Sequence, residues 1–223
     1  MGGERFSSSG PSENEGAAPW VPSRPTVPAL KAAVQECRGC ELYRDATQAV
    51  MGDGPAGARL MLLGEQPGDR EDREGLPFVG PAGRLLDDAL AAAGLADVPA
   101  YRTNVVKHFR YERGAGKRIH KSPSRWHVAA CEPWLLGELE AVSPVGVVVL
   151  GATAGQAVLG PSFRVGASRG ARLDWPADRF AVTRPPQWLL ATTHPSAVLR
   201  SRQRDTDFAA LVADLAVVRQ LLA

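Results

Sequence analysis

The stretch from Leu60 to Leu86 constrains the fold of this chain more than any other. An apolar run from Leu60 to Leu63 is long enough for a buried strand and stops at Gly64; a long polar loop follows, and then a helix start at Gly83. Open α/β sheets build ligand sites in this way, because such a loop lies at the carboxyl edge of the sheet and helix amides point into it. Loops of this length are usually functional, so we expect a binding site here.

The rest of the chain alternates between expected strands and helices. Strands are expected over 101–106, 145–150 and 188–192, with weaker signals at 171–175 and 180–183. Helices are expected over 82–93, from a cap at 122–124 to 141 with a kink or restart at Pro133, and over 152–159 and 206–222. The pattern predicts an α/β fold with a short parallel sheet and helices on both faces.

Length and composition predict one domain. A chain of 223 residues with 44% hydrophobic residues can bury one good core, which we place at 29–223. Residues 1–28 are rich in Gly, Ser, Pro and Glu and are expected to form a disordered tail. No apolar run is long enough to span a membrane and no signal-peptide core is visible, so we expect a cytoplasmic monomer without membrane association.

The positive charge of the chain is concentrated between residues 101 and 128. The formal net charge is only +2, which by itself says little about nucleic acid. This segment contains a single acidic residue, Glu112. Its basic residues are Arg102, Lys107, Arg110, Arg113, Lys117, Arg118, Lys121 and Arg125. Such runs are more often a solvated face than a nucleic-acid surface, but the expected loop and its hinge at 114–116 favour function.

The chain contains three cysteines. Cys37 and Cys40 are spaced as C-x-x-C, which fits a redox motif, half of a metal site or two idle thiols. The remaining one is Cys131, so a disulfide framework is excluded.

Polar side chains follow several of the expected strands. In a parallel sheet, the loops after Leu63, Val106 and Thr192 open at one edge, so their side chains can converge on one ligand. Those loops and strand ends hold three of the four histidines, and their candidate residues are Glu65, Gln66, Phe78, Asn104, His108, His120 and His194.

A family resemblance is carried by these same residues. The sequence Gly-Glu-Gln-Pro-Gly at 64–68, with the matching positions 71–72, 75, 77–80 and 82–83, resembles the first motif of family-four uracil-DNA glycosylases. The glutamine at position 66 resembles the UdgX-type relatives, which trap DNA covalently, because ordinary members of the family usually carry Ala at this position. The segments 103–107 and 194–196 also match, and the resemblance extends over 30–223. It implies a uracil-DNA glycosylase-like three-layer sandwich.

The resemblance implies a set of roles in releasing uracil from DNA. His194 would donate to the uracil O2, Phe78 would stack on the base and Asn104 would pair with its edge. Ionised Glu65 would stabilise the cationic sugar or take a proton from the nucleophile. Further substrate contacts are expected from Gln66 and Asp72, and DNA contacts from Lys117, Arg118 and Ser196. Without the resemblance, Phe78 could be core, Asn104 a strand-end turn and His194 a cap.

The resemblance also implies a cofactor. Family-four enzymes carry a cysteine ligand of a [4Fe–4S] cluster after Val-Val-Lys, and here that position is His108. With Cys37, Cys40 and Cys131 it completes a Cys₃His set, and imidazole ligates cluster iron in Rieske centres. Spacing alone would fit zinc equally well. We expect a structural cluster that ties the N-terminal loop to the DNA-facing segment.

The last matching segment is an insertion at 114–120. It resembles the Lys-Arg-Arg-Ile-His loop of the UdgX-type proteins, except that Gly116 stands where the first Lys would be. The resemblance implies that His120 replaces water as nucleophile, so that a single-turnover enzyme stays linked to the abasic deoxyribose of uracil-containing, preferentially single-stranded DNA and releases uracil. The alternatives are a hydrolytic glycosylase in which His120 binds phosphate, and a non-catalytic reader of uracil in single-stranded DNA. In an unrelated protein, His120 would be a surface histidine.

Overall fold

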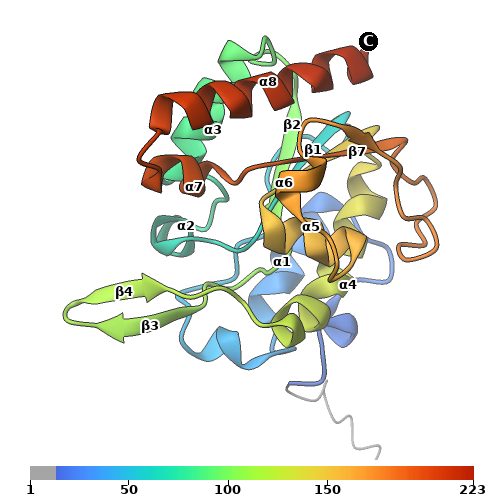
Figure 1. The fold of residues 1–223 in the computed structure, drawn as a ribbon. Coiled ribbons are helices and arrows are strands. Elements are labelled where there is room, and N and C mark those ends of the chain that lie inside the picture. Colours follow the sequence, from blue (N-terminus) through green and yellow to red (C-terminus); the bar gives the residue numbers. More distant parts are fainter. Residues whose placement is uncertain (1–13) are drawn as a thin grey trace, which may run out of the picture.

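The computed structural model describes residues 14–223 and is built around a five-stranded sheet (Figure 1). The strand order is β2-β1-β5-β7-β6, with the first four strands mutually parallel and β6 antiparallel to β7 at one edge. Their bounds are β1 Leu60–Gly64, β2 Ala100–Asn104, β5 Gly146–Leu150, β6 Arg172–Leu173 and β7 Trp188–Thr192. The predicted α/β fold with a parallel sheet is confirmed, with β6 as the antiparallel exception.

Helices cover both faces of the sheet, giving three layers (Figure 1). One face carries α3 Pro81–Ala92, α7 Pro195–Arg200 and α8 Arg204–Leu222, and the other carries α1 Val27–Ala33, α4 Arg125–Val142 and α5 Ala152–Leu159. Alternate side chains of β1 point to opposite faces of the sheet. Leu60 and Leu62 therefore pack under α3, α7 and α8, while Met61 and Leu63 pack against α1, α4 and α5. Burial on both faces explains why the central strands are continuous apolar runs.

Helix α4 begins at a capping box. The Ser124 hydroxyl accepts a hydrogen bond from the His127 amide, and His127 Nδ1 accepts one from the Ser124 amide. The helix continues without interruption through Pro133, so the expected restart there is wrong.

Two segments expected to be irregular contain regular structure. The polar loop after β1 includes α2 Asp69–Glu74, and the basic loop is a hairpin of β3 Tyr111–Gly114 and β4 Lys117–His120. Figure 1 shows the hairpin extending away from the body of the molecule. The remaining elements are η1 Ala18–Trp20, η2 Val34–Glu36, η3 Glu41–Arg44 and α6 Val165–Ser168.

The N-terminal segment packs onto the domain earlier than expected. The Gly16 amide donates to the Gly39 carbonyl at 2.9 Å and the Ala17 amide to the Ala130 carbonyl at 2.7 Å, and Ala17 is buried. The prediction of a disordered tail over 1–28 is therefore wrong for residues 14–28, while residues 1–13 lie outside the described part. In that described part, no helix has the length and apolar character needed to cross a membrane.

Candidate active site

A cavity of about 740 Å³ opens at the carboxyl ends of β1, β2, β5 and β7. The predicted residues that line it are Glu65, Gln66, Phe78, Asn104, His120, His194 and Ser196. The cavity also takes in Glu71, Thr153 and Arg200, which the sequence prediction did not assign to the site. The predicted convergence of these loops on one edge of the sheet is confirmed.

Gln66 holds the base of the hairpin. Its Oε1 accepts from the Arg110 amide at 3.2 Å, while its Nε2 donates to the carbonyls of Arg110 and Lys121, both at 3.1 Å. These main-chain partners determine which end of the amide is nitrogen. The same Nε2 lies 2.9 Å from His120 Nε2, so His120 accepts this hydrogen bond and carries its proton on Nδ1. Gln66 thus positions His120, and the substrate contact expected of it stays a prediction.

His120 is neutral and faces a carboxylate. Burial lowers its pKa below the ordinary value; the Glu65 charge opposes that shift and the Arg200 charge adds to it. His120 Nε2 lies 3.7 Å from Glu65 Oε1, and its side chain is 49% exposed. The unprotonated ring nitrogen, which accepts the hydrogen bond from Gln66, is therefore also the one next to Glu65.

Glu65 is held by a residue from another strand end. The Thr153 hydroxyl donates to Glu65 Oε2, which leaves Oε1 directed at His120. Thr153 lies in the first turn of α5, directly after β5, so it belongs to the same sheet edge as the predicted site. Its place after a buried strand is the signal that could have found it.

His194 is a neutral hydrogen-bond donor. Its Nδ1 accepts from the Ser196 amide at 3.1 Å, which places the proton on Nε2. The Ser196 hydroxyl lies 2.8 Å from the same Nδ1. Burial lowers the His194 pKa to about 4; the charge of Arg200 acts in the same direction, as does that of His120 when its ring is protonated. Ser196, predicted to contact DNA, serves here as the partner that sets the His194 tautomer.

Phe78 and Asn104 lie together over Gly64. A Cβ at Gly64 would collide with Asn104 Oδ1 and lie 2.8 Å from Phe78 Cζ, so any larger residue at the end of β1 would displace these two side chains. Phe78 has a φ of +59°, and its ring lies 6.5 Å from that of His194 at 27°. Asn104 is 3% exposed, and no described residue hydrogen-bonds to its side-chain amide. Its edge can therefore pair with a ligand.

The loop between β1 and α3 is closed by Glu71. This carboxylate accepts a hydrogen bond from the Gly80 amide at 2.8 Å and lies against Gly68. It joins the two ends of the loop that carries Phe78.

Three predicted contact residues lie outside the cavity: Asp72, Lys117 and Arg118. Asp72 is fully buried and accepts hydrogen bonds from the Thr47 amide and from Arg118, at 2.6 Å for the latter. The predicted substrate contact by Asp72 is therefore wrong, because α2 turns this carboxylate toward the hairpin.

Arg118 is likewise committed to the protein. Its guanidinium pairs with Asp69 and Asp72 and lies over the rings of Phe109 and Tyr111, at 5.4 and 5.0 Å. Its side chain is 15% exposed, and the phosphate contact expected of it stays a prediction. Lys117, at the exposed turn, remains a predicted DNA contact.

The three cysteines lie together in one hydrophobic core. Cys37, Cys40 and Cys131 are free and buried, and the charges of Cys37 and Cys40 act on Cys131. Burial raises the pKa of Cys40 to about 11 and that of Cys131 to about 12. Cys131 Sγ accepts a hydrogen bond from the Lys107 amide at 3.3 Å. Because Lys107 directly precedes His108, the main chain that carries His108 lies close to Cys131.

His108 is buried, and burial lowers its pKa to about 4, opposed by the charge of Asp72. Among the described residues, no three His, Cys, Asp or Glu side chains are arranged to hold a metal ion. The three thiols are thus close together, but they and His108 are not arranged as the ligands of a metal ion. The predicted ligand set stays a prediction.

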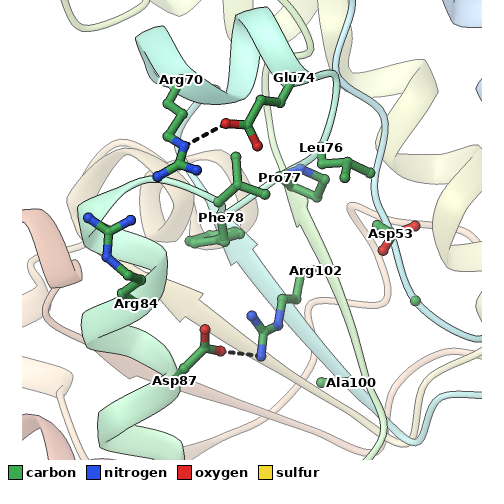
Figure 2. Close-up of a pocket in the computed structure, with 12 residues that line it drawn as sticks. Asp53, Arg70, Glu74, Leu76, Pro77, Phe78, Arg84, Asp87, Ala100 and Arg102 are labelled. Carbon is green, nitrogen blue, oxygen red and sulfur yellow. Dashed lines mark hydrogen bonds and ion pairs between the residues drawn. The ribbon is translucent and has the colours of Figure 1, made fainter.

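A second cavity, of about 490 Å³, also borders Phe78 (Figure 2). Figure 2 shows Arg70 paired with Glu74 and Arg102 paired with Asp87 in its wall. Its charges largely neutralise one another and it contains no histidine. The chemistry therefore belongs to the larger cavity.

Comparisons with known proteins agree with this site. Residues 51–216 match the model of the uracil DNA glycosylase superfamily. The Type-4 uracil-DNA glycosylase of Thermotoga maritima is 34% identical over 173 residues, which cover 77% of this chain and 82% of that protein. That of Archaeoglobus fulgidus is 37% identical over 123 residues, covering 55% and 58%.

Proposed function

Because the chain belongs to the uracil DNA glycosylase superfamily, we propose that it excises uracil from DNA and then becomes linked to the abasic deoxyribose through His120. The observation that carries the covalent part is the neutral His120, whose Nε2 electron pair lies in the cavity 3.7 Å from Glu65. Single-stranded DNA is the preferred substrate, because no base pair or second strand opposes extrusion of the nucleotide.

Three residues would recognise the extruded base. Asn104 donates to uracil O4 and accepts from N3, which distinguishes uracil from cytosine. The Phe78 ring supplies a flat face for stacking. His194 Nε2–H donates to O2, where negative charge develops as the base leaves. Because the His194 pKa is about 4, this donor is a neutral imidazole at physiological pH.

The bond that breaks joins the sugar C1′ to uracil N1. Both electrons leave with the base, so the sugar becomes cationic and uracil anionic before it takes a proton from solvent. The Glu65 carboxylate, held by Thr153, stabilises the cation while His194 stabilises the anion. Opposite charges are thereby matched by different groups that line one cavity.

His120 then competes with water for the sugar cation. Its Nε2 electron pair forms the new bond to C1′; an oriented group of this kind can have an effective concentration on the order of 10⁵ M or more. Gln66 can release Nε2 readily, since its two N–H groups have three acceptors, two of which are main-chain carbonyls.

The proton left on His120 Nδ1 must be lost to give a neutral glycosyl-imidazole. The resemblance implies that Glu65 removes this proton, but the Glu65 carboxylate faces Nε2 and not Nδ1. The half-exposed ring instead passes this proton to solvent. The neutral product has a poor leaving group, so the adduct persists.

A [4Fe–4S] cluster held by Cys37, Cys40, His108 and Cys131 is part of this proposal. All three thiols are buried, and burial raises the pKa of two of them, Cys40 and Cys131; a metal centre would take all three as thiolates. The main-chain hydrogen bond from Lys107 to Cys131 is of the kind that orients a cluster thiolate. Such a centre would tie the N-terminal segment to the strand end that carries Asn104.

A uracil-containing oligonucleotide tests the proposal. The protein is incubated with it, and free uracil and the denaturing-gel mobility of the DNA are both measured. We expect released uracil together with a protein–DNA band that survives heat and detergent. Uracil release without that band would favour the hydrolytic enzyme, and binding without release would favour the non-catalytic reader.

A further inference from the structure

A buried network of polar side chains holds the end of β2. At its centre Lys107 and Glu138 form an ion pair, with 2.7 Å between Nζ and Oε2 and no exposure of either side chain. The ammonium group uses all three of its N–H donors, since it also donates to the Thr103 hydroxyl at 2.8 Å and to the Asn104 carbonyl at 2.6 Å. The pair therefore contacts the main chain of the residue that we propose to recognise uracil.

The Glu138 carboxylate fixes the ammonium group in this place. Its Oε1 accepts hydrogen bonds from the Gly52 amide at 2.9 Å, the Tyr101 hydroxyl at 3.1 Å and the Thr103 hydroxyl at 2.8 Å. Glu138 lies on α4, so the network joins this helix to β2 and to the segment before β1. Because these partners come from separate segments, neither the carboxylate nor the lysine paired with it has much freedom to move.

The Asn104 amide depends on its main chain for its position. No described residue hydrogen-bonds to this amide, which packs against Gly64. The amides of the two residues that follow Asn104 donate to the carbonyls of Gly64 and Glu65, at 3.0 and 3.1 Å. The carbonyl of Asn104 itself is held by the Lys107 ammonium group, three residues further along the chain. A side chain that must meet the edge of a base at hydrogen-bonding distance needs a main chain fixed in this way.

We propose that the pair of Lys107 and Glu138 positions Asn104 and thereby sets the rate of uracil release. The inference rests on the proposed function, in which Asn104 pairs with the uracil edge. Stability alone does not explain a buried ion pair, because apolar residues of similar volume often replace such a pair without loss. The hydrogen bond to the Asn104 carbonyl gives this pair a use in the reaction. A binding group displaced by about 1 Å can slow a reaction on the order of 100-fold.

Three variants separate this role from the contribution of the pair to stability. Lys107→Met removes the contact with Asn104 and leaves the Glu138 charge unpaired. Lys107→Met/Glu138→Gln removes the same contact but leaves no buried charge, and the glutamine Oε1 can still accept from Gly52 and Tyr101. Glu138→Gln leaves the lysine charge unpaired but keeps the hydrogen bond from Lys107 to Asn104.

Stability and uracil release should fall in different variants. In urea, the double variant should unfold closer to the parent than either single variant does. Uracil release from a single-stranded oligonucleotide, measured over a single turnover, should slow by about tenfold or more in both variants that lack the lysine, and by much less in Glu138→Gln. The metal content of all three should equal that of the parent, because Cys131 is contacted by the main-chain amide of residue 107.

A cycle with Asn104→Ala tests whether the pair acts through Asn104. Once this side chain is removed, adding the double substitution should slow release by less than about twofold, because no amide is left to position. Full additivity of the two losses, release at the parent rate in the double variant, or rates that follow the urea midpoints would overturn the positioning role. A parent that releases no uracil, or Asn104→Ala acting at the parent rate, would instead overturn the proposed function.

Discussion

His120 Nε2 accepts a hydrogen bond from Gln66 Nε2 at 2.9 Å. The main-chain partners of Gln66 determine the direction of this bond, so one glutamine sets both the position of the hairpin and the tautomer of its histidine. A residue that never needs to touch uracil thereby prepares the nitrogen that we propose to attack the sugar.

Replacing Gln66 with Ala should slow adduct formation by about tenfold, because the hairpin loses three main-chain contacts and His120 loses its fixed tautomer. Uracil release should fall less, since Asn104, His194 and Glu65 are untouched. The two rates are measured on the same oligonucleotide. Gln48→Ala is the control, because Gln48 also bridges carbonyls, those of Asp72 and Arg73, but not in the hairpin. Equal losses of both rates would contradict the positioning role.

Replacing His120 with Gly or Ser should abolish the adduct and leave room for water. The variant should then release uracil as a conventional glycosylase and leave an alkali-labile site. Gel mobility before and after alkali separates the two products. An adduct that survives the loss of His120 would place the nucleophile elsewhere.

The pH dependence should report His194. Its pKa of about 4 lies below the ordinary 6.5, so the neutral donor persists as the pH falls below 6.5. In His120→Gly, uracil release should stay nearly constant from pH 7 to about 5 and decline toward 4. An inflection near 6.5 would show that His194 titrates normally.

The free energy of unfolding should depend on pH because of the lowered His194 pKa. Between pH 6.5 and 4 the unfolded chain binds a proton at His194 that the folded protein does not, so the free energy of unfolding should fall as the pH is lowered through this window. Urea unfolding of the parent and of His194→Asn at several pH values measures it. The variant should show a weaker pH dependence.

The buried pair of Lys107 and Glu138 should be important for stability. Its Nζ–Oε2 distance is 2.7 Å and both side chains are fully buried. Lys107→Met would leave Glu138 charged without its partner, at a cost of about 3–5 kcal/mol in unfolding free energy. Lys121→Met is the control, since its pair with Glu112 is exposed and is expected to contribute less than about 1 kcal/mol. Similar losses in the two variants would contradict this account.

The purified protein should be brown and contain iron. Cys131→Ser should lose that iron, because it removes one of the three gathered thiols. His108→Cys should keep the cluster and lower its reduction potential, as thiolate in place of imidazole does. Metal analysis and a redox titration test both. Stoichiometric zinc without iron would overturn the cluster.

Much of the framework could be predicted from the sequence. The strands β1, β5 and β7 are short apolar runs with glycine or polar residues at their ends, and α5 was predicted with its observed bounds, Ala152–Leu159. The gathering of Glu65, Asn104 and His194 followed from topology, because the ends of parallel strands meet at one edge. These features depend on local pattern and on general rules of chain connection.

The tertiary structure alone decided the roles of the polar supports. Arg118 looked like a phosphate ligand and Asp72 a substrate contact, yet they pair across 46 residues of sequence. Thr153 and Ser196 gained their roles by facing Glu65 and His194. The sequence by itself determined which strands form and where the chemistry lies, because burial is encoded in local periodicity. Only the folded chain decided which charged side chains pair within the protein and which tautomer each histidine adopts. Hydrogen bonds and ion pairs between distant segments leave no local pattern in the sequence.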